Sequence, residues 1–185
     1  MAKQIWKPGT VIYPLPVVLI TVGDETIQNI FTVAWTGTIC TDPAMTYISV
    51  RKERYSYDII KRTKEFCINL TTKDLVLATD YCGVKSGKNE DKFKAMNLTK
   101  SKASVISSPI LLESPVNIEC RVTEIKELGS HDMFMANVVA VNVDDKYIDE
   151  NLKFDIKKCN LVTYAHGEYF ALGEKLGKFG YSVKK

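Results

Sequence analysis

Basic side chains gather at the end of a predicted strand, where they could bind an anion. Arg51, Lys52 and Arg54 directly follow an alternating apolar run, and Ser56 opens a predicted helix that continues to Lys64. The free N–H groups of a first helical turn point outward, and the helix dipole favours negative charge there. Guanidinium groups add paired, charge-assisted hydrogen bonds. The segment therefore predicts either a phosphate site or a basic, solvated strand end beside an ordinary N-cap.

A second segment, one predicted strand earlier, combines a large aromatic residue with small polar ones. Trp35 is followed by Thr36, Gly37 and Thr38, which we predict to form a turn. Because Gly37 has no side chain, a planar ligand could approach the backbone there. The two threonine hydroxyls and the neighbouring N–H groups could satisfy the rim of a heteroaromatic ring. The alternative is a tryptophan packed on a barrel wall, and the residues alone leave both interpretations open.

Strand-like segments dominate the chain, which predicts a mainly β protein with short helices, built as a small barrel or sandwich. Strands are expected over residues 17–22, 30–35, 45–50, 65–70, 116–122, 133–143 and 161–164, and helices over 56–64, 73–81 and 91–96. Since the 185 residues contain no repeat or linker, residues 1–185 are expected to form a single domain. The glycine- and aromatic-rich segment from residue 173 is expected at the surface or along a partner.

Composition narrows the class of protein. Hydrophobic residues make up 45% and charged residues 25% of the chain, and the net charge is +3. Because the lysines are scattered, nothing indicates a nucleic-acid partner. The longest apolar run, residues 17–22, is too short to cross a membrane, and the N-terminus lacks the apolar segment of a secretory signal. We therefore expect a cytoplasmic protein with no nucleic-acid or membrane partner.

Metal and nucleophile chemistry find little support in the sequence. His131 and His166 are the only histidines and lie far apart in the chain, so no metal site is expected. The number of cysteines, five, is odd and their spacing matches no zinc pattern, which favours reduced, mostly buried thiols. Cys82, near Lys85, is the best candidate nucleophile, but burial is the expected fate of its thiol.

Taken together, the motifs resemble those of the flavin-reductase-like, FMN-binding split-barrel family, and the flavoredoxin branch is the nearest match. The resemblance runs from about Pro16 to the C-terminus. It departs from the family pattern at Ala44, where many relatives are expected to have a second proline. The matching segments are residues 35–43, 48–51, 54–58, 82–87, 91–93, 114–122, 128–132 and 172–183.

The resemblance implies an FMN-binding split β-barrel that forms a homodimer, with non-covalent FMN near the subunit interface. It assigns Trp35, Thr36, Gly37 and Thr38 to the ring and ribityl side of the cofactor. The phosphate side receives Arg51, Arg54, Tyr55 and Ser56, with Lys92 as a further cationic contact. His131 is placed near the exposed face of the ring, where a nicotinamide or a partner cofactor would approach.

The implied function is an FMN-binding oxidoreductase of the flavin reductase or flavoredoxin type. It would take electrons from NAD(P)H, as a transient donor, or from a redox protein, and pass them to an acceptor. Because the flavin carries the chemistry, we predict no catalytic side chain. The alternative is a flavin-binding carrier or storage module without turnover of its own.

Overall fold

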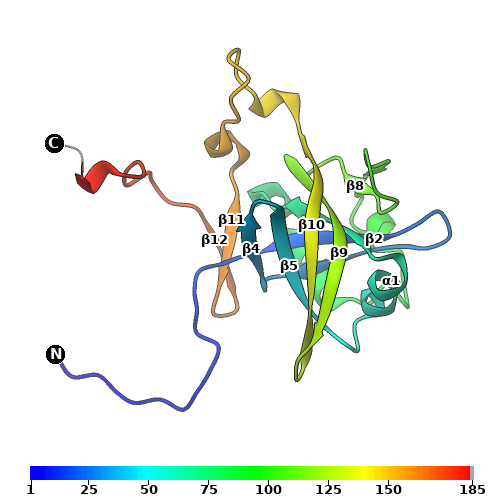
Figure 1. Ribbon diagram of the computed structural model, residues 1–185, viewed down its shortest axis with the longest axis horizontal. Helices are drawn as coiled ribbons and strands as arrows, with labels where there is room; N and C mark the ends of the chain where they lie inside the picture. The colour runs from blue at the N-terminus through cyan, green and yellow to red at the C-terminus, as the bar shows by residue number, and fades with distance from the viewer. Residues whose placement is uncertain (184–185) are drawn as a thin grey trace.

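A seven-stranded antiparallel sheet forms the body of the protein in the computed structural model, which describes residues 1–183 (Figure 1). The strand order is β3-β2-β6-β9-β10-β5-β4. The fold is therefore mainly β, as predicted. The strands are β2 (Val18–Gly23), β3 (Gln28–Val33), β4 (Thr36–Thr41), β5 (Ala44–Arg51), β6 (Glu65–Leu70), β9 (Val116–Glu127) and β10 (His131–Val143).

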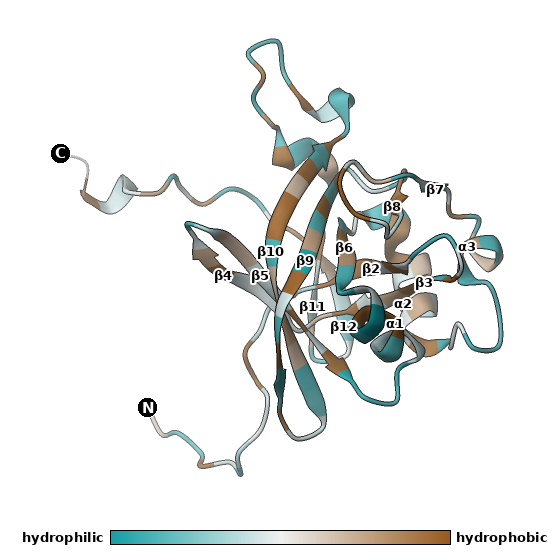
Figure 2. Ribbon diagram, turned by 45° about the vertical axis from the view of Figure 1, so that its right-hand side comes forward, coloured by the Kyte–Doolittle hydropathy of each residue, from teal (hydrophilic) through white to brown (hydrophobic). Residues whose placement is uncertain are grey.

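The two edge strands of the sheet, β3 and β4, are consecutive in the chain and are joined by residues 34–35 alone, so the sheet curls back on itself. The N–H of Ser49, on β5, donates to the carbonyl of Trp35, which directly precedes β4, at 2.9 Å, and so extends the β4–β5 pairing. Inside the curl lies a continuous apolar core that includes Ile20, Ile48 and Phe134. Colouring by hydropathy shows the alternation of apolar and polar residues along β9 and β10 (Figure 2). Alternate residues of β10 are buried from Asp132 to Ala136, as an alternating strand predicts, whereas both faces of β9 are covered from Val116 to Cys120, where Asn117 and Glu119 are buried as well.

Three short helices and several 3-10 turns connect the strands. The helices are α1 (Tyr55–Thr63), α2 (Val76–Val84) and α3 (Lys92–Ala95), and the 3-10 turns are η1 (Lys73–Leu75), η2 (Asp145–Tyr147), η3 (Ile156–Cys159) and η4 (Tyr181–Val183). Asp91 caps α3, because its carboxylate accepts from the N–H groups of Phe93 and Lys94. In the structure described here, no helix is long and apolar enough to cross a membrane.

Two local expectations were wrong. Ser56 does not cap α1: Arg54 occupies the N-cap position, and Ser56 lies inside the helix, buried, with its hydroxyl accepting from the Asn29 amide at 2.8 Å. The turn expected at residues 35–38 is instead the start of β4, because the backbone pairs with β5 from Thr36 onward. In both places a tertiary contact overrides a local preference.

A small second sheet covers one side of the barrel. Its strands are β1 (Leu15–Pro16), β11 (Val162–Ala165) and β12 (Glu168–Ala171), in the order β1-β11-β12; β7 (Lys100–Ser101) and β8 (Ile110–Leu111) form a separate pair. The small sheet is fastened to α2 by the Tyr169 hydroxyl, which donates to the Asp80 carboxylate at 3.0 Å. This contact also raises the pKa of Tyr169, with burial as the larger cause. The small sheet is therefore held against α2.

Buried polar groups hold the long connections in place. Glu119, on β9, is fully buried, and its carboxylate accepts from the backbone N–H groups of Ser104, Val105 and Ile106 and from the Asn142 amide. Burial alone would raise the pKa of Glu119, but these hydrogen bonds lower it below the ordinary value. The carboxylate therefore stays charged and anchors the connection that precedes β8.

Candidate functional site

Two adjoining cavities lie where the strand ends of the barrel meet α1, α2 and the small sheet. We name them the aromatic cavity, of about 390 Å³, and the cationic cavity, of about 410 Å³. Phe31, Arg51 and Arg54 line both of them. The two hollows are therefore neighbours along one continuous surface, and a single elongated ligand could occupy both.

The aromatic cavity is built from flat side chains on opposite walls. The rings of Trp35 and His131 pack against one another, with centroids 4.4 Å apart and planes inclined by 37°. Tyr164 and Tyr169, on β11 and β12, line the other side and contact each other edge to face. Because Trp35 remains partly exposed, the cavity presents aromatic surface to solvent. Such a lining suits a planar heteroaromatic group.

Strand register brings His131 to this cavity. His131 begins β10 and lies opposite Arg51 across the β10–β5 pair. The Ser130 hydroxyl is 2.9 Å from Nδ1 of the imidazole. Partial burial lowers the pKa of His131 below its ordinary value, and the positive charge of Arg51 lowers it further. The imidazole is accordingly neutral at pH 7.

The cationic cavity is built around the start of α1. Tyr55 and Ser56, in the first turn of this helix, line it together with Lys85 and Lys92. The first N–H groups of the helix have no partner within the helix, so the cavity combines the positive end of a helix dipole with basic side chains. Such an arrangement stabilises an anion, and a phosphate fits its chemistry.

Lys92 is a buried cation beneath this cavity. Its side chain is almost fully buried, and Nζ donates to the carbonyls of Cys82 and Lys85, each at 3.1 Å. Burial lowers the pKa of Lys92 to about 8, and the charge of Arg54 contributes in the same direction. An ammonium group makes three hydrogen bonds, and the two carbonyls accept two of them. One N–H remains for an anion in the cavity.

The three basic residues at the end of β5 and directly after it have different roles. Arg54 donates to the Gly83 carbonyl at 2.6 Å, which fixes its guanidinium against the end of α2. Arg51 is half exposed, and within residues 1–183 its guanidinium forms a salt bridge with Glu53 alone, at 3.3 Å. Lys52 lies 3.5 Å from Asp132 and lines neither cavity. Of the three, Arg51 is the side chain most available to a ligand.

A buried hydrogen bond links α1, whose first turn lines the cationic cavity, to β10, whose first residue lines the aromatic cavity. The hydroxyl of Tyr57, on α1, donates to the fully buried carboxylate of Asp132 at 2.6 Å. This contact is the main cause that raises the pKa of Tyr57 to about 12. Since Asp132 follows His131 in β10, the bond couples the first turn of α1 to the histidine of the aromatic cavity.

The structure brings most of the candidate residues together. Seven line one or both cavities: Trp35, Arg51, Arg54, Tyr55, Ser56, Lys92 and His131. Thr36, Gly37 and Thr38 line neither of these two cavities. Thr36 is buried and its hydroxyl donates to the Tyr47 carbonyl at 2.6 Å, while a side chain at Gly37 would meet the Tyr47 ring at 3.3 Å. Thr38 is exposed on β4, at the edge of the sheet.

Several lining residues had no signal in the sequence. Phe31 lies in a strand that reads as ordinary core, and Tyr164 and Tyr169 come from a hairpin of which only the first strand was predicted. Asn29 reaches the cationic cavity because its amide holds Ser56. Each becomes a site residue only through a long-range contact. In residues 1–183, no group of three His, Cys, Asp or Glu side chains is placed to hold a metal.

Comparison with known proteins identifies relatives of this architecture. A family model described as a flavin reductase like domain matches residues 10–173. A solved flavoredoxin of Desulfovibrio vulgaris (Miyazaki F) is 32% identical, with a TM-score of 0.91 over 99% of this chain and 100% of that chain. A flavoredoxin from Methanosarcina acetivorans is 28% identical, with a TM-score of 0.88 and the same coverage. An uncharacterized protein of Archaeoglobus fulgidus is 29% identical over 149 residues, which are 80% of this chain and 84% of the relative.

The charge of Arg51 should be measurable in the titration of His131. We expect Arg51→Gln to raise the pKa of His131, because a positive charge that disfavours the imidazolium is removed. Proton NMR of the two histidines checks this, with His131→Gln identifying the resonance. Lys52→Gln is the matched control, since Lys52 faces Asp132 instead. An unchanged His131 titration in Arg51→Gln would contradict the electrostatic coupling.

Proposed function

The chain belongs to the flavin reductase-like family, and we propose that it is an FMN-dependent oxidoreductase of that family. A flavin cofactor and an oxidoreductase-type function are supported by the family match and by the two flavoredoxin structures. The identity of the flavin as FMN, its non-covalent binding and the transfer of electrons from NAD(P)H or a redox protein are our proposal.

One observation supports the proposal above all others. The aromatic and cationic cavities adjoin, because Phe31, Arg51 and Arg54 line both of them. A flavin mononucleotide has a planar ring at one end and a phosphate at the other. The aromatic cavity offers Trp35 and His131 to the ring, and the cationic cavity offers basic groups to the phosphate. The residues that line the two cavities therefore fit the ring and the phosphate of FMN, and the two cavities adjoin as the two ends of the cofactor do.

Each end of the site has a separate task. When bound, the flavin supplies hydride and electron transfer, while the protein supplies binding, orientation and access. Arg51, Lys92 and the first N–H groups of α1 hold the phosphate and so place the ring. Trp35 and His131 limit the access of water to one side of it. The neutral imidazole of His131 places no positive charge beside the electron donor.

The partners of the protein follow from the same site. A nicotinamide or a redox protein would approach the exposed side of the aromatic cavity, and a second copy of the chain would lie next to it in a homodimer. A carrier or storage module without turnover is the second candidate function.

Purified protein should be yellow and should release FMN when denatured. We expect anaerobic addition of NADH or NADPH to bleach the visible flavin band, because the exposed side of the aromatic cavity admits a nicotinamide. Persistence of the band with both nicotinamides, followed by bleaching with a reduced redox protein, would indicate that a protein is the electron donor. Persistence with every donor would indicate a carrier or storage module. Colourless protein that fails to take up added FMN would contradict both candidate functions.

Arg51 should recognise the phosphate end of the ligand. We expect Arg51→Ala to weaken FMN binding by roughly tenfold to a hundredfold, as loss of a hydrogen bond between charged groups implies, and to leave riboflavin binding nearly unchanged. Fluorescence titration with the two flavins measures both affinities. Lys126→Ala, which removes an exposed positive charge outside both cavities, is the control. Equal losses for FMN and riboflavin would refute the phosphate role.

Lys92 should make FMN binding depend on pH. Its pKa of about 8 lies below the ordinary lysine value, so the unliganded side chain loses its proton as the pH rises through 8, and a bound phosphate dianion would restore it. We therefore expect FMN affinity to fall between pH 7 and about pH 9.5 while riboflavin affinity stays level. Lys92→Met should flatten the FMN profile, with circular dichroism confirming that the variant folds. A profile in Lys92→Met that matches the native one would exclude the contact.

A further inference from the structure

The amine of Lys92 is held by two backbone carbonyls that leave one direction open. Nζ donates to the carbonyls of Cys82 and Lys85, each at 3.1 Å, and the side chain is almost fully buried. Because Lys92 lines the cationic cavity, the remaining position of Nζ can meet another molecule there. When the amine loses its third proton, the two carbonyls keep the two N–H groups, and the lone pair takes the remaining position. The carbonyls therefore direct a lone pair at the cavity.

The surroundings of Lys92 favour the uncharged amine. Burial is the largest cause that lowers its pKa to about 8; the charge of Arg54 acts in the same direction, and Cys82 and Glu90 act against it. Close to pH 8, about half of the Lys92 side chains carry a free lone pair, compared with a small fraction of an ordinary lysine. A desolvated lysine of this kind is a nucleophile. Lys92 thus combines an available lone pair with a fixed direction.

The rest of the cationic cavity attracts an anion to this amine. Arg51, Arg54 and Lys85 line the cavity together with Lys92, and Glu53 is a carboxylate in the same lining. Glu53 is already paired with the Arg51 guanidinium, at 3.3 Å. Positive charge therefore exceeds negative charge, and the first N–H groups of α1 add to it. A phosphate group in this cavity of about 410 Å³ lies in the same hollow as the amine of Lys92.

An acyl phosphate matches both features of the cavity. It has an anionic phosphate, and its electrophilic carbonyl carbon is separated from the phosphorus by a single bridging oxygen. A group that contacts the phosphate is therefore also close to the carbonyl carbon. Cations around the phosphate stabilise the negative charge that it gains as it leaves. The thiol of Cys82 does not compete, because it is buried away from the cavity and its pKa is raised to about 11 by burial.

We propose that acyl phosphates bind in the cationic cavity and acylate Lys92 when no other phosphate occupies it. The uncharged Nζ attacks the carbonyl carbon, and the bond between this carbon and the bridging oxygen breaks. Inorganic phosphate leaves with the electron pair of that bond, and the surplus proton of the amine passes to the phosphate or to solvent. An amide remains on Lys92, and the reaction needs no oxidant and no further reactant.

Acylation of Lys92 would also control the flavin site. The amide carries no positive charge, and its acyl group occupies space in the cationic cavity, so a flavin phosphate would bind there less tightly. A bound flavin phosphate would in turn shield the amine from acylation. This consequence rests on the proposed function, whereas the acylation itself rests only on the cavity and the amine.

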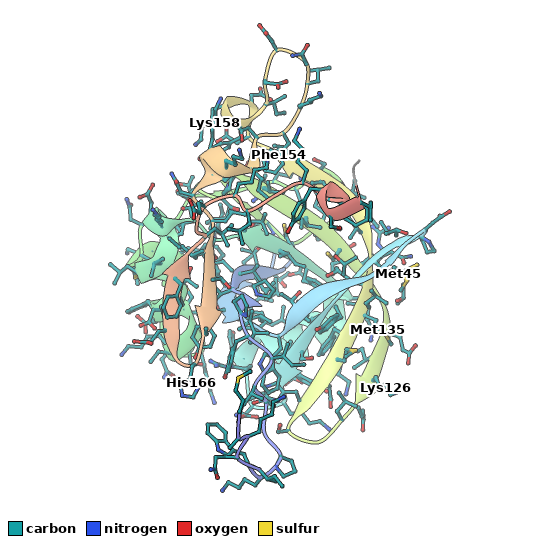
Figure 3. The ribbon with its side chains drawn as sticks, turned by 90° about the vertical axis from the view of Figure 1, so that its left-hand side faces the viewer. Met45, Lys126, Met135, Phe154, Lys158 and His166 are labelled. Atoms are coloured by element: carbon teal, nitrogen blue, oxygen red, sulfur yellow. The ribbon has the colours of Figure 1, made fainter. Side chains whose placement is uncertain are left out.

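Acetyl phosphate is the probe for the reaction. We expect peptide mass spectrometry at pH 8 to show acetylation of Lys92 roughly tenfold faster than of Lys126, because more of the Lys92 amine is uncharged and the reagent is bound beside it. Lys126, at the end of β9, is exposed and outside both cavities (Figure 3). An excess of inorganic phosphate should slow the reaction at Lys92 alone. Equal rates at Lys92 and Lys126 would overturn the proposal, as would faster acetylation of Lys85, which is exposed in the same cavity.

A neutral reagent tests whether the phosphate directs the reaction. We expect Arg51→Gln to slow acetylation of Lys92 by acetyl phosphate roughly tenfold, because a charged hydrogen bond to the reagent is lost. The N-hydroxysuccinimide ester of acetic acid has no phosphate, so its rate at Lys92 should be the same in Arg51→Gln and in the native protein. Circular dichroism checks that the variant folds. An Arg51→Gln rate with acetyl phosphate that equals the native rate would overturn binding of the reagent in the cavity.

The consequence for the flavin is measured separately. We expect acetylated protein, and Lys92→Gln as its neutral counterpart, to bind FMN roughly tenfold more weakly than native protein and to keep their riboflavin affinity. Unchanged FMN affinity after acetylation would overturn the control of the flavin site. If the native protein binds no FMN, the proposed function fails, and the acetylation of Lys92 with its inhibition by inorganic phosphate still decides the inference.

Discussion

The buried carboxylate of Asp132 is the group on which the geometry of the whole site depends. A charge removed from water is tolerated only when its hydrogen bonds are satisfied. Asp132 meets this requirement by accepting from the Tyr57 hydroxyl and from the N–H of Leu128, with Lys52 nearby. Burial would raise its pKa, but these partners keep it below the ordinary value. The need to satisfy one carboxylate thereby sets α1 against β10, and with it the start of α1 against His131.

The C-terminal end of α2 and the N-terminal end of α1 together set the charge of the cationic cavity. The final carbonyls of α2 are the negative end of a helix dipole, and they accept from Arg54 and Lys92. The first turn of α1, the positive end of another, lines the same cavity. The two cations are thus positioned by α2 before any ligand arrives, so little side-chain entropy is lost when an anion binds. Because the ammonium group of Lys92 is buried in this position, its pKa is lowered.

Local sequence patterns were sufficient for the elements but not for the details of the site. The strand over residues 65–70 was predicted to the residue. Ser56 was misplaced as a helix cap, because the Asn29 amide, far away in sequence, binds its hydroxyl inside the helix. Thr36 was expected to face a ligand, yet its hydroxyl is taken by the Tyr47 carbonyl across the β4–β5 pair. A local pattern contains no information about such partners.

Strand periodicity and charge are local properties, so the amino-acid order was enough to predict a mainly β fold, short helices and a concentration of basic groups at the end of β5. The resemblance of its motifs added the flavin reductase-like family, which the family model then showed. The folded chain was needed to see that Arg51 and Arg54 line both cavities while Lys52 turns to Asp132, and that Tyr164 and Tyr169 line the aromatic cavity. The reason is physical: which side chains share a cavity depends on strand register and on buried hydrogen bonds between distant segments, and neither is written in any single stretch of chain.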